Sequence, residues 1–335
     1  MKNRKILIYQ DGKSEIAEEN MCERQRGEAI VRVKACGVCG SDLPRIFKNR
    51  AYYYPIVLGH EFSGVVEESE NENLIGKRVS VFPILPCGKC EFCKKGLYAN
   101  CVKYGYYGSR QNGGMQDYIA VKEENLVPLP DNVSFETGAM TEPAAVCLHA
   151  VKKAAVKPGE SVAVYGAGTI GLLCAMWAKA FGASNVYVTD IDEKKLEFAK
   201  KLGFFAYTGE RVQAVFECSG AGACVNAAIE TADAFGRIVL VGNAAADVII
   251  PAGNYAKILR KQLAVFGSWN SDFTIGGAAG TNDWAESVRA MSDGKIQPQL
   301  LITHKIALKD WSRAVEIMKN RQFFNKIMVV TDDAE

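Results

Sequence analysis

The fold of the second half of this chain is decided by the stretch Ser161-Val-Ala-Val-Tyr165 and the turn Gly166-Ala-Gly-Thr-Ile-Gly171 that follows it. The first five residues predict a buried strand, and the apolar run from Thr169 to Phe181 predicts a helix. A glycine-rich turn between a strand and a helix is typical of a dinucleotide site. Its glycines permit a tight turn, close approach of a pyrophosphate and close packing of helix on strand.

A carboxylate lies where such a site needs one. Asp190 ends the next predicted strand, Asn185 to Thr189, and lies 24 residues after Gly166. It would accept hydrogen bonds from the ribose hydroxyls and repel a 2′-phosphate, which favours NAD over NADP. A glycine turn without a ligand is the alternative. The expected cofactor contacts are Gly166, Gly168, Thr169, Ile170, Gly171 and Asp190.

The pattern of predicted secondary structure changes near residue 145. Before it, short β-branched runs between turn residues predict an irregular, mostly β domain. After it, strands and helices alternate, which predicts a doubly wound parallel sheet. Only residues 203–213 separate a predicted helix from the strand that begins at Ala214, and these 11 residues are too few for an ordinary helical crossover. We therefore expect a trimmed sheet edge there.

Four cysteines form a tight cluster in the sequence. Cys87, Cys90, Cys93 and Cys101 follow the pattern C-x2-C-x2-C-x7-C. This spacing favours a closed, structural zinc site with four thiolate ligands. An iron–sulfur cluster is the competing interpretation, but the chain lacks a second set and a proline after the fourth cysteine.

A second group of possible ligands is scattered along the chain. Cys39, His60 and Glu142, with Glu61 directly after the histidine, are residue types that supply an open, catalytic zinc site. Taken singly, a cysteine or a histidine is more often a packing residue. The pair Cys36 and Cys39 also permits a redox interpretation, although its surroundings lack the expected strand-to-helix context.

Composition narrows the class of protein. The formal net charge is +2 without a basic block, which argues against binding to nucleic acid. The glycine-broken apolar stretch from Val162 to Trp177 is not a convincing membrane span, and the apolar run after Met1 is too short for a signal peptide. We therefore expect a cytoplasmic protein, in which the 11 cysteines stay reduced.

Five motifs occur together in the order seen in one enzyme family. They are Gly37-Val-Cys-Gly-Ser-Asp42, Gly59-His-Glu-Phe-Ser-Gly64, the Cys87 to Cys101 cluster, Glu142-Pro143 and the Gly166 turn. In these motifs the chain resembles the zinc-dependent medium-chain alcohol and polyol dehydrogenases. The resemblance implies a GroES-like β-barrel catalytic domain at residues 1–145 and 269–335, and a Rossmann domain at residues 146–268. It also implies two zinc ions per chain, bound NAD, and a homodimer or homotetramer.

The resemblance also implies roles for individual residues. Cys39 and His60 would ligate the catalytic zinc, with Glu142 as the third ligand and Glu61 as an alternative ligand. Asp42 would orient a ligand, and the Ser41 hydroxyl would pass the substrate proton outward. The zinc would polarise the substrate oxygen, so that hydride passes to the nicotinamide ring.

One departure from the family bears on the substrate. Many relatives continue the proton relay through a histidine shortly after the serine, where this chain has Pro44 and Arg45. A guanidinium suits bidentate contact with phosphate, so we hypothesise that Arg45, with Lys48 or Arg110, recognises a substrate phosphate. An exposed loop cation is the plain alternative.

The leading expectation is an oxidoreductase that transfers hydride from a secondary alcohol of a polyol phosphate to NAD. A sorbitol- or threonine-type dehydrogenase with an unphosphorylated substrate is the alternative within enzymes. A zinc-stabilised, NAD-binding protein without turnover is the alternative outside them.

Overall fold

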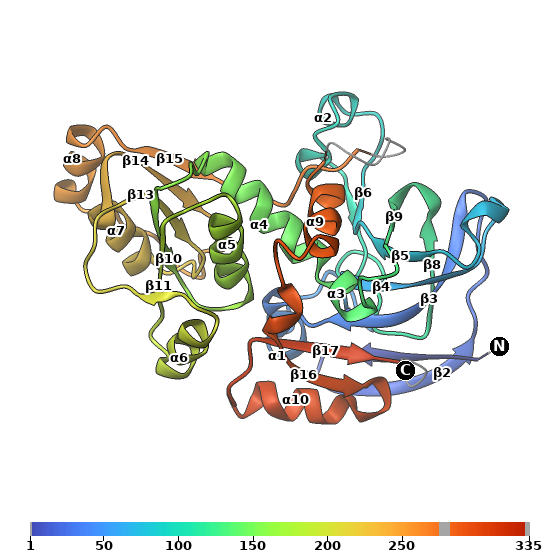
Figure 1. Ribbon diagram of the computed structural model, residues 1–335. Coiled ribbons are helices and arrows are strands. Elements are labelled where there is room, and N and C mark those ends of the chain that lie inside the picture. Colours follow the sequence, from blue (N-terminus) through green and yellow to red (C-terminus); the bar gives the residue numbers. More distant parts are fainter. Residues whose placement is uncertain (1, 275–281, 332–335) are drawn as a thin grey trace. The chain divides into compact units, whose positions relative to one another are not determined.

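The computed structural model describes residues 2–274 and 282–331 (Figure 1). The chain divides into two compact units. The first comprises Met1–Glu142, Asp272–Gly294 and Pro298–Glu335, and the second comprises Pro143–Ser271 and Lys295–Gln297. The last part of the chain therefore returns to the unit in which the chain begins.

A six-stranded parallel sheet forms the second unit. Its strand order is β12-β11-β10-β13-β14-β15, which is the order of a dinucleotide-binding sheet and confirms the predicted doubly wound fold. The strands are β10 (Ser161–Tyr165), β11 (Asn185–Thr189), β12 (Phe205–Ala206), β13 (Val212–Glu217), β14 (Ala232–Leu240) and β15 (Ala264–Gly267). The helices are α4 (Thr141–Ala154), which starts in the first unit, α5 (Thr169–Ala180), α6 (Glu193–Lys201), α7 (Gly222–Thr231) and α8 (Ala252–Arg260).

Alternation along β10 explains why helices cover both faces of this sheet. Ala163 and Tyr165 pack in one apolar cluster with Ala228 and Ile229 of α7. Val164 points to the opposite face, where a Cβ on Gly171 of α5 would lie 3.1 Å from its side chain. A strand buried on both faces reads as a continuous apolar run, as this one does.

The shortened crossover has a structural counterpart at the sheet edge. The strand β12 is only two residues long, and no helix lies between it and β13. In place of a helix, Tyr165 and Tyr207 each share a 2.7 Å hydrogen bond with the hydroxyl of Thr231. The residue after the two-residue edge strand, Tyr207, is thereby linked through Thr231 to Tyr165 of β10.

The first unit is built on a seven-stranded sheet. Its main order is β16-β17-β3-β4-β5-β9, and β8 also pairs with β3. The strands are β16 (Ile302–Ala307), β17 (Lys326–Val330), β3 (Glu28–Gly37), β4 (Glu61–Glu68), β5 (Arg78–Val81), β9 (Leu126–Pro128) and β8 (Tyr118–Lys122). Because β17 pairs antiparallel with β3, residues from both ends of the chain share one sheet.

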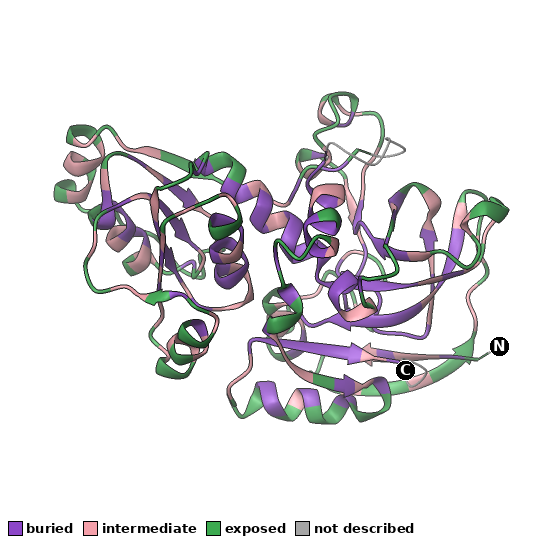
Figure 2. Cartoon of the chain, in the orientation of Figure 1, coloured by how far each residue is buried: buried purple, intermediate pink, exposed green. Residues whose placement is uncertain are grey.

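Smaller elements complete this unit. Two antiparallel pairs lie outside the main sheet, namely β1 (Lys2–Ile8) with β2 (Ser14–Asn20), and β6 (Ile84–Leu85) with β7 (Gly105–Tyr106). Its helices are α1 (Leu43–Phe47), α2 (Glu91–Lys94), α3 (Phe135–Ala139), α9 (Asp283–Ser292) and α10 (Trp311–Lys319). Buried residues gather along the sheet strands of both units (Figure 2). Within residues 2–274 and 282–331, every helix is too short or too polar to cross a membrane.

Candidate active site

Cys39 lies in the turn that follows β3. Its thiol accepts a hydrogen bond from the backbone N–H of Ser41 at 3.5 Å, and its own N–H donates to Asp42 Oδ2 at 3.0 Å. These two contacts cap the short helical turn Gly40–Asp42 reciprocally. The capped turn holds the Cys39 sulfur in place at the end of a central strand.

His60 and Glu61 stand at the start of β4, which pairs with the end of β3. Glu61 lies opposite Gly37, where a Cβ would come within 2.2 Å of the Glu61 carboxylate. Gly59 adopts φ +96°, a backbone conformation that directs His60 inward and that side chains other than glycine rarely allow. As a result, ligand atoms of Cys39, His60 and Glu61 all lie within 4.8 Å of one another.

Glu142 approaches the same place from α4. Its carboxylate accepts a 3.1 Å hydrogen bond from the Tyr106 hydroxyl, and the Tyr106 ring lies edge-on to His60 with 5.5 Å between centroids. Burial, opposed by His60 and assisted by the neighbouring Glu61, raises the pKa of Glu142 to about 7. Glu142 is outside the 4.8 Å group, so the structure brings Cys39, His60 and Glu61 closest together.

Lys326 is a site residue that the sequence interpretation missed. Its Nζ donates to both Glu61 oxygens, at 2.6 and 2.8 Å, and to the carbonyl of Val38 at 3.2 Å. The side chain is almost completely buried. One feature of the sequence could have identified it, namely a lysine at the start of an otherwise apolar strand, Lys326-Ile-Met-Val-Val330.

The buried donor set fits a zinc ion. Thiolate, imidazole and carboxylate are ligands that zinc prefers, and an ion here would neutralise carboxylates that are costly to bury. Asp42 Oδ1 lies 3.8 Å from His60 Nδ1, which has no hydrogen-bond partner and faces away from water. Burial lowers the pKa of His60, but the nearby Cys39 and Asp42 outweigh this and raise it to about 10. The imidazole therefore lies in a strongly negative environment that suits a cation.

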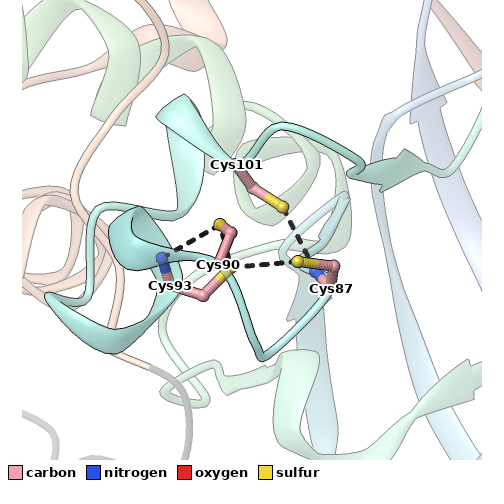
Figure 3. A group of neighbouring side chains, drawn as sticks. All are labelled: Cys87, Cys90, Cys93 and Cys101. Carbon is pink, nitrogen blue, oxygen red and sulfur yellow. Dashed lines mark hydrogen bonds between the residues drawn. The ribbon is translucent and has the colours of Figure 1, made fainter.

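The four-cysteine cluster forms a separate site around α2. Figure 3 shows the four sulfur atoms turned toward one another. Tetrahedral zinc with ligands at about 2.3 Å requires sulfur atoms about 3.8 Å apart. The Cys93 sulfur lies 3.9 Å from that of Cys87 and 3.4 Å from that of Cys90. Backbone N–H groups, first that of Cys93, lower the pKa of Cys90 to about 6 and so favour the thiolate.

The glycine turn of the second unit fits a dinucleotide. Gly166 has φ +102°, and a Cβ on Gly171 would lie 1.7 Å from the Gly166 carbonyl. By contrast, a Cβ on Gly168 would meet nothing within 4 Å, so space is open where a phosphate would approach. The N-cap of α5, Gly168, makes no side-chain cap hydrogen bond, and the N-terminus of a helix favours an anion through its dipole and backbone N–H groups. Asp190 accepts from the N–H groups of Ala167 and Asp192, at 2.7 and 3.0 Å.

The three candidate phosphate ligands have different surroundings. Arg45 donates to the Ser41 carbonyl, the Ser41 hydroxyl and Asp42. Arg110 lies over the rings of Tyr52 and Tyr104, at 4.6 and 4.2 Å from their centroids. Lys48 is exposed at the end of α1. Arg45 forms an ion pair with Asp42. Among the described residues, Arg110 and Lys48 form no ion pair with a carboxylate.

Two family models match the chain, one to each part of the fold. Residues 25–131 match the alcohol dehydrogenase GroES-like domain, and residues 169–293 match the zinc-binding dehydrogenase domain. The chain belongs to the medium-chain, zinc-dependent dehydrogenase family and is an oxidoreductase of that class. The predicted GroES-like and Rossmann fold is thereby confirmed.

Individual relatives narrow the comparison. The chain is 35% identical to galactitol 1-phosphate 5-dehydrogenase of Escherichia coli K12, over 96% of this chain and 97% of that one. The crystal structure of galactitol-1-phosphate dehydrogenase from Escherichia coli matches with a TM-score of 0.89 over 98% of this chain and 99% of that chain. L-idonate 5-dehydrogenase of Vitis vinifera is 32% identical, over 85% of this chain and 83% of its own. The relatives thus include enzymes named for phosphorylated and for unphosphorylated polyols or sugar acids.

Structures of relatives also differ in the cofactor they contain. A dehydrogenase from Escherichia coli in complex with NADH has a TM-score of 0.88 at 26% identity, over 98% of this chain and 99% of that one. A zinc-binding dehydrogenase from Sinorhizobium meliloti bound to NADP has the same TM-score, identity and coverage.

Proposed function

We propose that the chain oxidises a secondary alcohol of a polyol phosphate with NAD, and that the pair converted is galactitol 1-phosphate and tagatose 6-phosphate. The observation that carries the phosphate part is Arg110, a guanidinium held on two tyrosine rings, with no carboxylate partner within residues 2–274 and 282–331. Tyr104 lies edge-on to Tyr106, which contacts His60 and Glu142, so an aromatic path connects this cation to the candidate metal ligands.

The proposed reaction assigns a task to each residue of the site. Cys39, His60 and either Glu61 or Glu142 would hold the catalytic zinc, which supplies polarisation of the substrate oxygen when bound. The Ser41 hydroxyl would take the proton that the substrate alcohol loses and release its own to a cofactor hydroxyl or to water. Asp42 would keep Cys39 and His60 oriented. Tyr106 would hold the Glu142 carboxylate through their 3.1 Å hydrogen bond.

NAD is the proposed hydride acceptor. Gly166, Gly168 and Gly171 leave room for the pyrophosphate, and Thr169 and Ile170 present backbone N–H groups. The Asp190 carboxylate would accept from the ribose hydroxyls and repel a 2′-phosphate. The proposed cofactor domain comprises residues 146–268, and the proposed catalytic domain comprises residues 1–145 and 269–335.

A substrate panel tests this function. Formation of NADH is followed with galactitol 1-phosphate, galactitol, sorbitol and threonine, before and after chelation of zinc. We expect kcat/KM to be at least about tenfold higher for the phosphorylated polyol, as a lost charge-assisted contact implies. Equal rates with free polyols would favour the sorbitol-type alternative, and no turnover with any substrate would favour a binding protein without catalysis.

Charge-neutral variants locate the phosphate contact. Arg110→Gln and Lys48→Gln should raise KM for the phosphorylated polyol and leave KM for the free polyol unchanged. Arg45→Gln belongs in the same series as a test of the competing assignment, because Arg45 Nη1 already contacts Ser41 and Asp42. A variant that changes KM for both substrates equally does not remove a phosphate ligand.

We also propose that the chain forms a homodimer or homotetramer in the cytoplasm. The strand β15 ends the six-stranded sheet, and its residues Val265 and Phe266 are exposed, as are Tyr255 and Leu259 of the neighbouring helix α8. An apolar edge strand suits pairing with a second copy. Val265→Lys should shift the mass measured by light scattering toward the monomer, whereas Ile75→Lys, at an exposed apolar residue of the other unit, should not.

A further inference from the structure

One side chain of the first unit connects the candidate proton acceptor with the residues that orient the metal ligands. Arg45 Nη1 donates to the Ser41 carbonyl at 2.7 Å, to Ser41 Oγ at 3.1 Å and to Asp42 Oδ1 at 3.1 Å. The Arg45 side chain is only 17% exposed, and the Asp42 side chain is completely buried. The Asp42 contact is directed into the protein, whereas the Ser41 contacts lie at its surface.

Asp42 contacts Arg45 on one side and two candidate metal ligands on the other. Its Oδ2 atom accepts from the N–H of Cys39 at 3.0 Å, and its Oδ1 atom lies 3.8 Å from His60 Nδ1. Arg45 thus contacts the oxygen that faces His60. Within the described residues, loss of Arg45 would leave Asp42 with the Cys39 N–H on Oδ2 and the nearby His60, and Oδ1 would lose the hydrogen bond that fixes it.

The Ser41 contact restricts the direction of the serine hydroxyl. A guanidinium is a donor only and stays protonated in proteins. Ser41 Oγ must therefore accept from Arg45, and the hydrogen of the hydroxyl must point elsewhere. Arg45 cannot take the next place in a proton relay, but by occupying one lone pair of Ser41 Oγ it fixes the direction of the other, so that Oγ can accept the proton of the substrate alcohol while the serine's own hydrogen leaves toward a cofactor hydroxyl or water.

We propose that Arg45 is a positioning residue, which orients the Ser41 hydroxyl toward the substrate oxygen and the Asp42 carboxylate toward Cys39 and His60. The part of this inference that concerns Ser41 rests on the proposed dehydrogenase function. The part that concerns Asp42 does not, because it makes a statement about metal retention alone. The inference also differs from the phosphate hypothesis, which would give Arg45 an effect on phosphorylated substrates only.

The first experiment measures zinc release to a chelator from the purified, zinc-loaded protein. Arg45→Gln should release the zinc at Cys39 and His60 about 10 to 100 times more readily than the unaltered chain, the usual effect of losing a partner of a ligand. The zinc of the four-cysteine site serves as an internal reference and should be released as before. Arg50→Gln is the matched control, since Arg50 is an exposed cation shortly after α1, the helix that carries Arg45.

The second experiment measures kcat and KM with galactitol 1-phosphate and with galactitol. Arg45→Gln should lower kcat about tenfold for both, with less than a threefold change in KM, because the lost contacts are to protein groups and not to the phosphate. Combined with Ser41→Ala, it should lower kcat by less than the product of the two single losses, since both changes remove the same oriented hydroxyl. Arg45→Lys should restore part of kcat. If Arg45→Gln does not fold, the same measurements are made on Arg45→Lys.

Two results would overturn the inference. One is unchanged zinc release together with an increase in KM for the phosphorylated polyol alone, which would make Arg45 a phosphate ligand. The other is independent, multiplying losses in Arg45→Gln and Ser41→Ala. If the unaltered chain oxidises none of the polyols, the proposed function fails, and the zinc-release comparison still decides whether Arg45 acts through Asp42.

Discussion

Lys326 places a buried positive charge directly against a candidate metal ligand. It contacts both oxygens of Glu61, and both side chains are almost inaccessible to water. Replacing one member of a buried ion pair leaves the other charge uncompensated, whereas an exposed pair contributes little. Lys326 is therefore a determinant of stability as well as a neighbour of the site.

Lys326→Met should reduce the free energy of unfolding by about 3–5 kcal/mol. The loss should be larger in chelated protein, because a bound zinc supplies positive charge near Glu61. Urea-induced unfolding with and without chelator measures both values. Lys305→Met is the control, since Lys305 pairs with Glu136 at the surface, and it should cost less than about 1 kcal/mol.

Glu142 predicts a pH dependence with a defined sign. Burial raises its pKa from the ordinary 4.5 to about 7 in the folded, metal-free chain. Between these values the folded state holds a proton that the unfolded state has lost, so stability falls as pH rises. The melting temperature of chelated protein should therefore fall relative to that of Glu142→Gln from about pH 4.5 to pH 7, by several degrees. If the melting temperatures of the two proteins change with pH in the same way across this range, the raised pKa of Glu142 is contradicted.

At the scale of elements, the four-cysteine segment has little else to hold it. Its helix α2 is four residues long, and many of its residues are exposed. Structural zinc contributes folding free energy directly in such segments. Cys90→Ser should therefore raise amide hydrogen exchange in residues 87–101 to nearly unprotected rates, while the strands of the main sheet stay protected. Cys39→Ser should leave exchange in that segment unchanged, and equal effects of both variants would argue against two separate metal sites.

The shortened crossover between β12 and β13 gives a second prediction for an element. The Thr231 hydroxyl is shared by Tyr165 and Tyr207, and burial raises the pKa of Tyr165 to about 12. Thr231→Val keeps the shape and removes the shared partner, so it should cost about 1–3 kcal/mol in unfolding free energy. Thr231→Ser retains the hydroxyl and should cost clearly less, and identical losses in the two variants would show that the hydroxyl is not what matters.

At the scale of the whole molecule, the two kinds of site belong to different units. The candidate ligands of the catalytic metal lie in the first unit, and the glycine turn and Asp190 lie in the second. Sites without shared partners act independently to within about 0.5 kcal/mol. Cys39→Ser should therefore change the dissociation constant of NADH by less than about threefold, as measured by NADH fluorescence. Asp190→Ser should weaken NADH binding and narrow the preference over NADPH, and loss of NADH binding in Cys39→Ser would contradict this independence.

Features that depend on neighbouring residues were predictable from the sequence. The strand, the glycine turn and the helix from Ser161 to Ala180 agree with the prediction because apolar periodicity and glycine placement act locally. The convergence of the Cys87 to Cys101 sulfurs follows from short spacings that one loop can satisfy. The family resemblance assigned Cys39, His60, Glu61 and Glu142 to one metal site. Their spacing in the sequence alone did not place them together.

The sequence by itself thus determined the fold class, the four-cysteine site and the dinucleotide turn of this protein. Tertiary structure decided that Lys326, 265 residues from Glu61 in the chain, pairs with that carboxylate. It also decided that Arg45 faces Ser41 and Asp42, and that Tyr165 and Tyr207 share the hydroxyl of Thr231. Such contacts depend on strand pairing and on packing between distant segments, as when β17 joins β3, and no local pattern of residues encodes them.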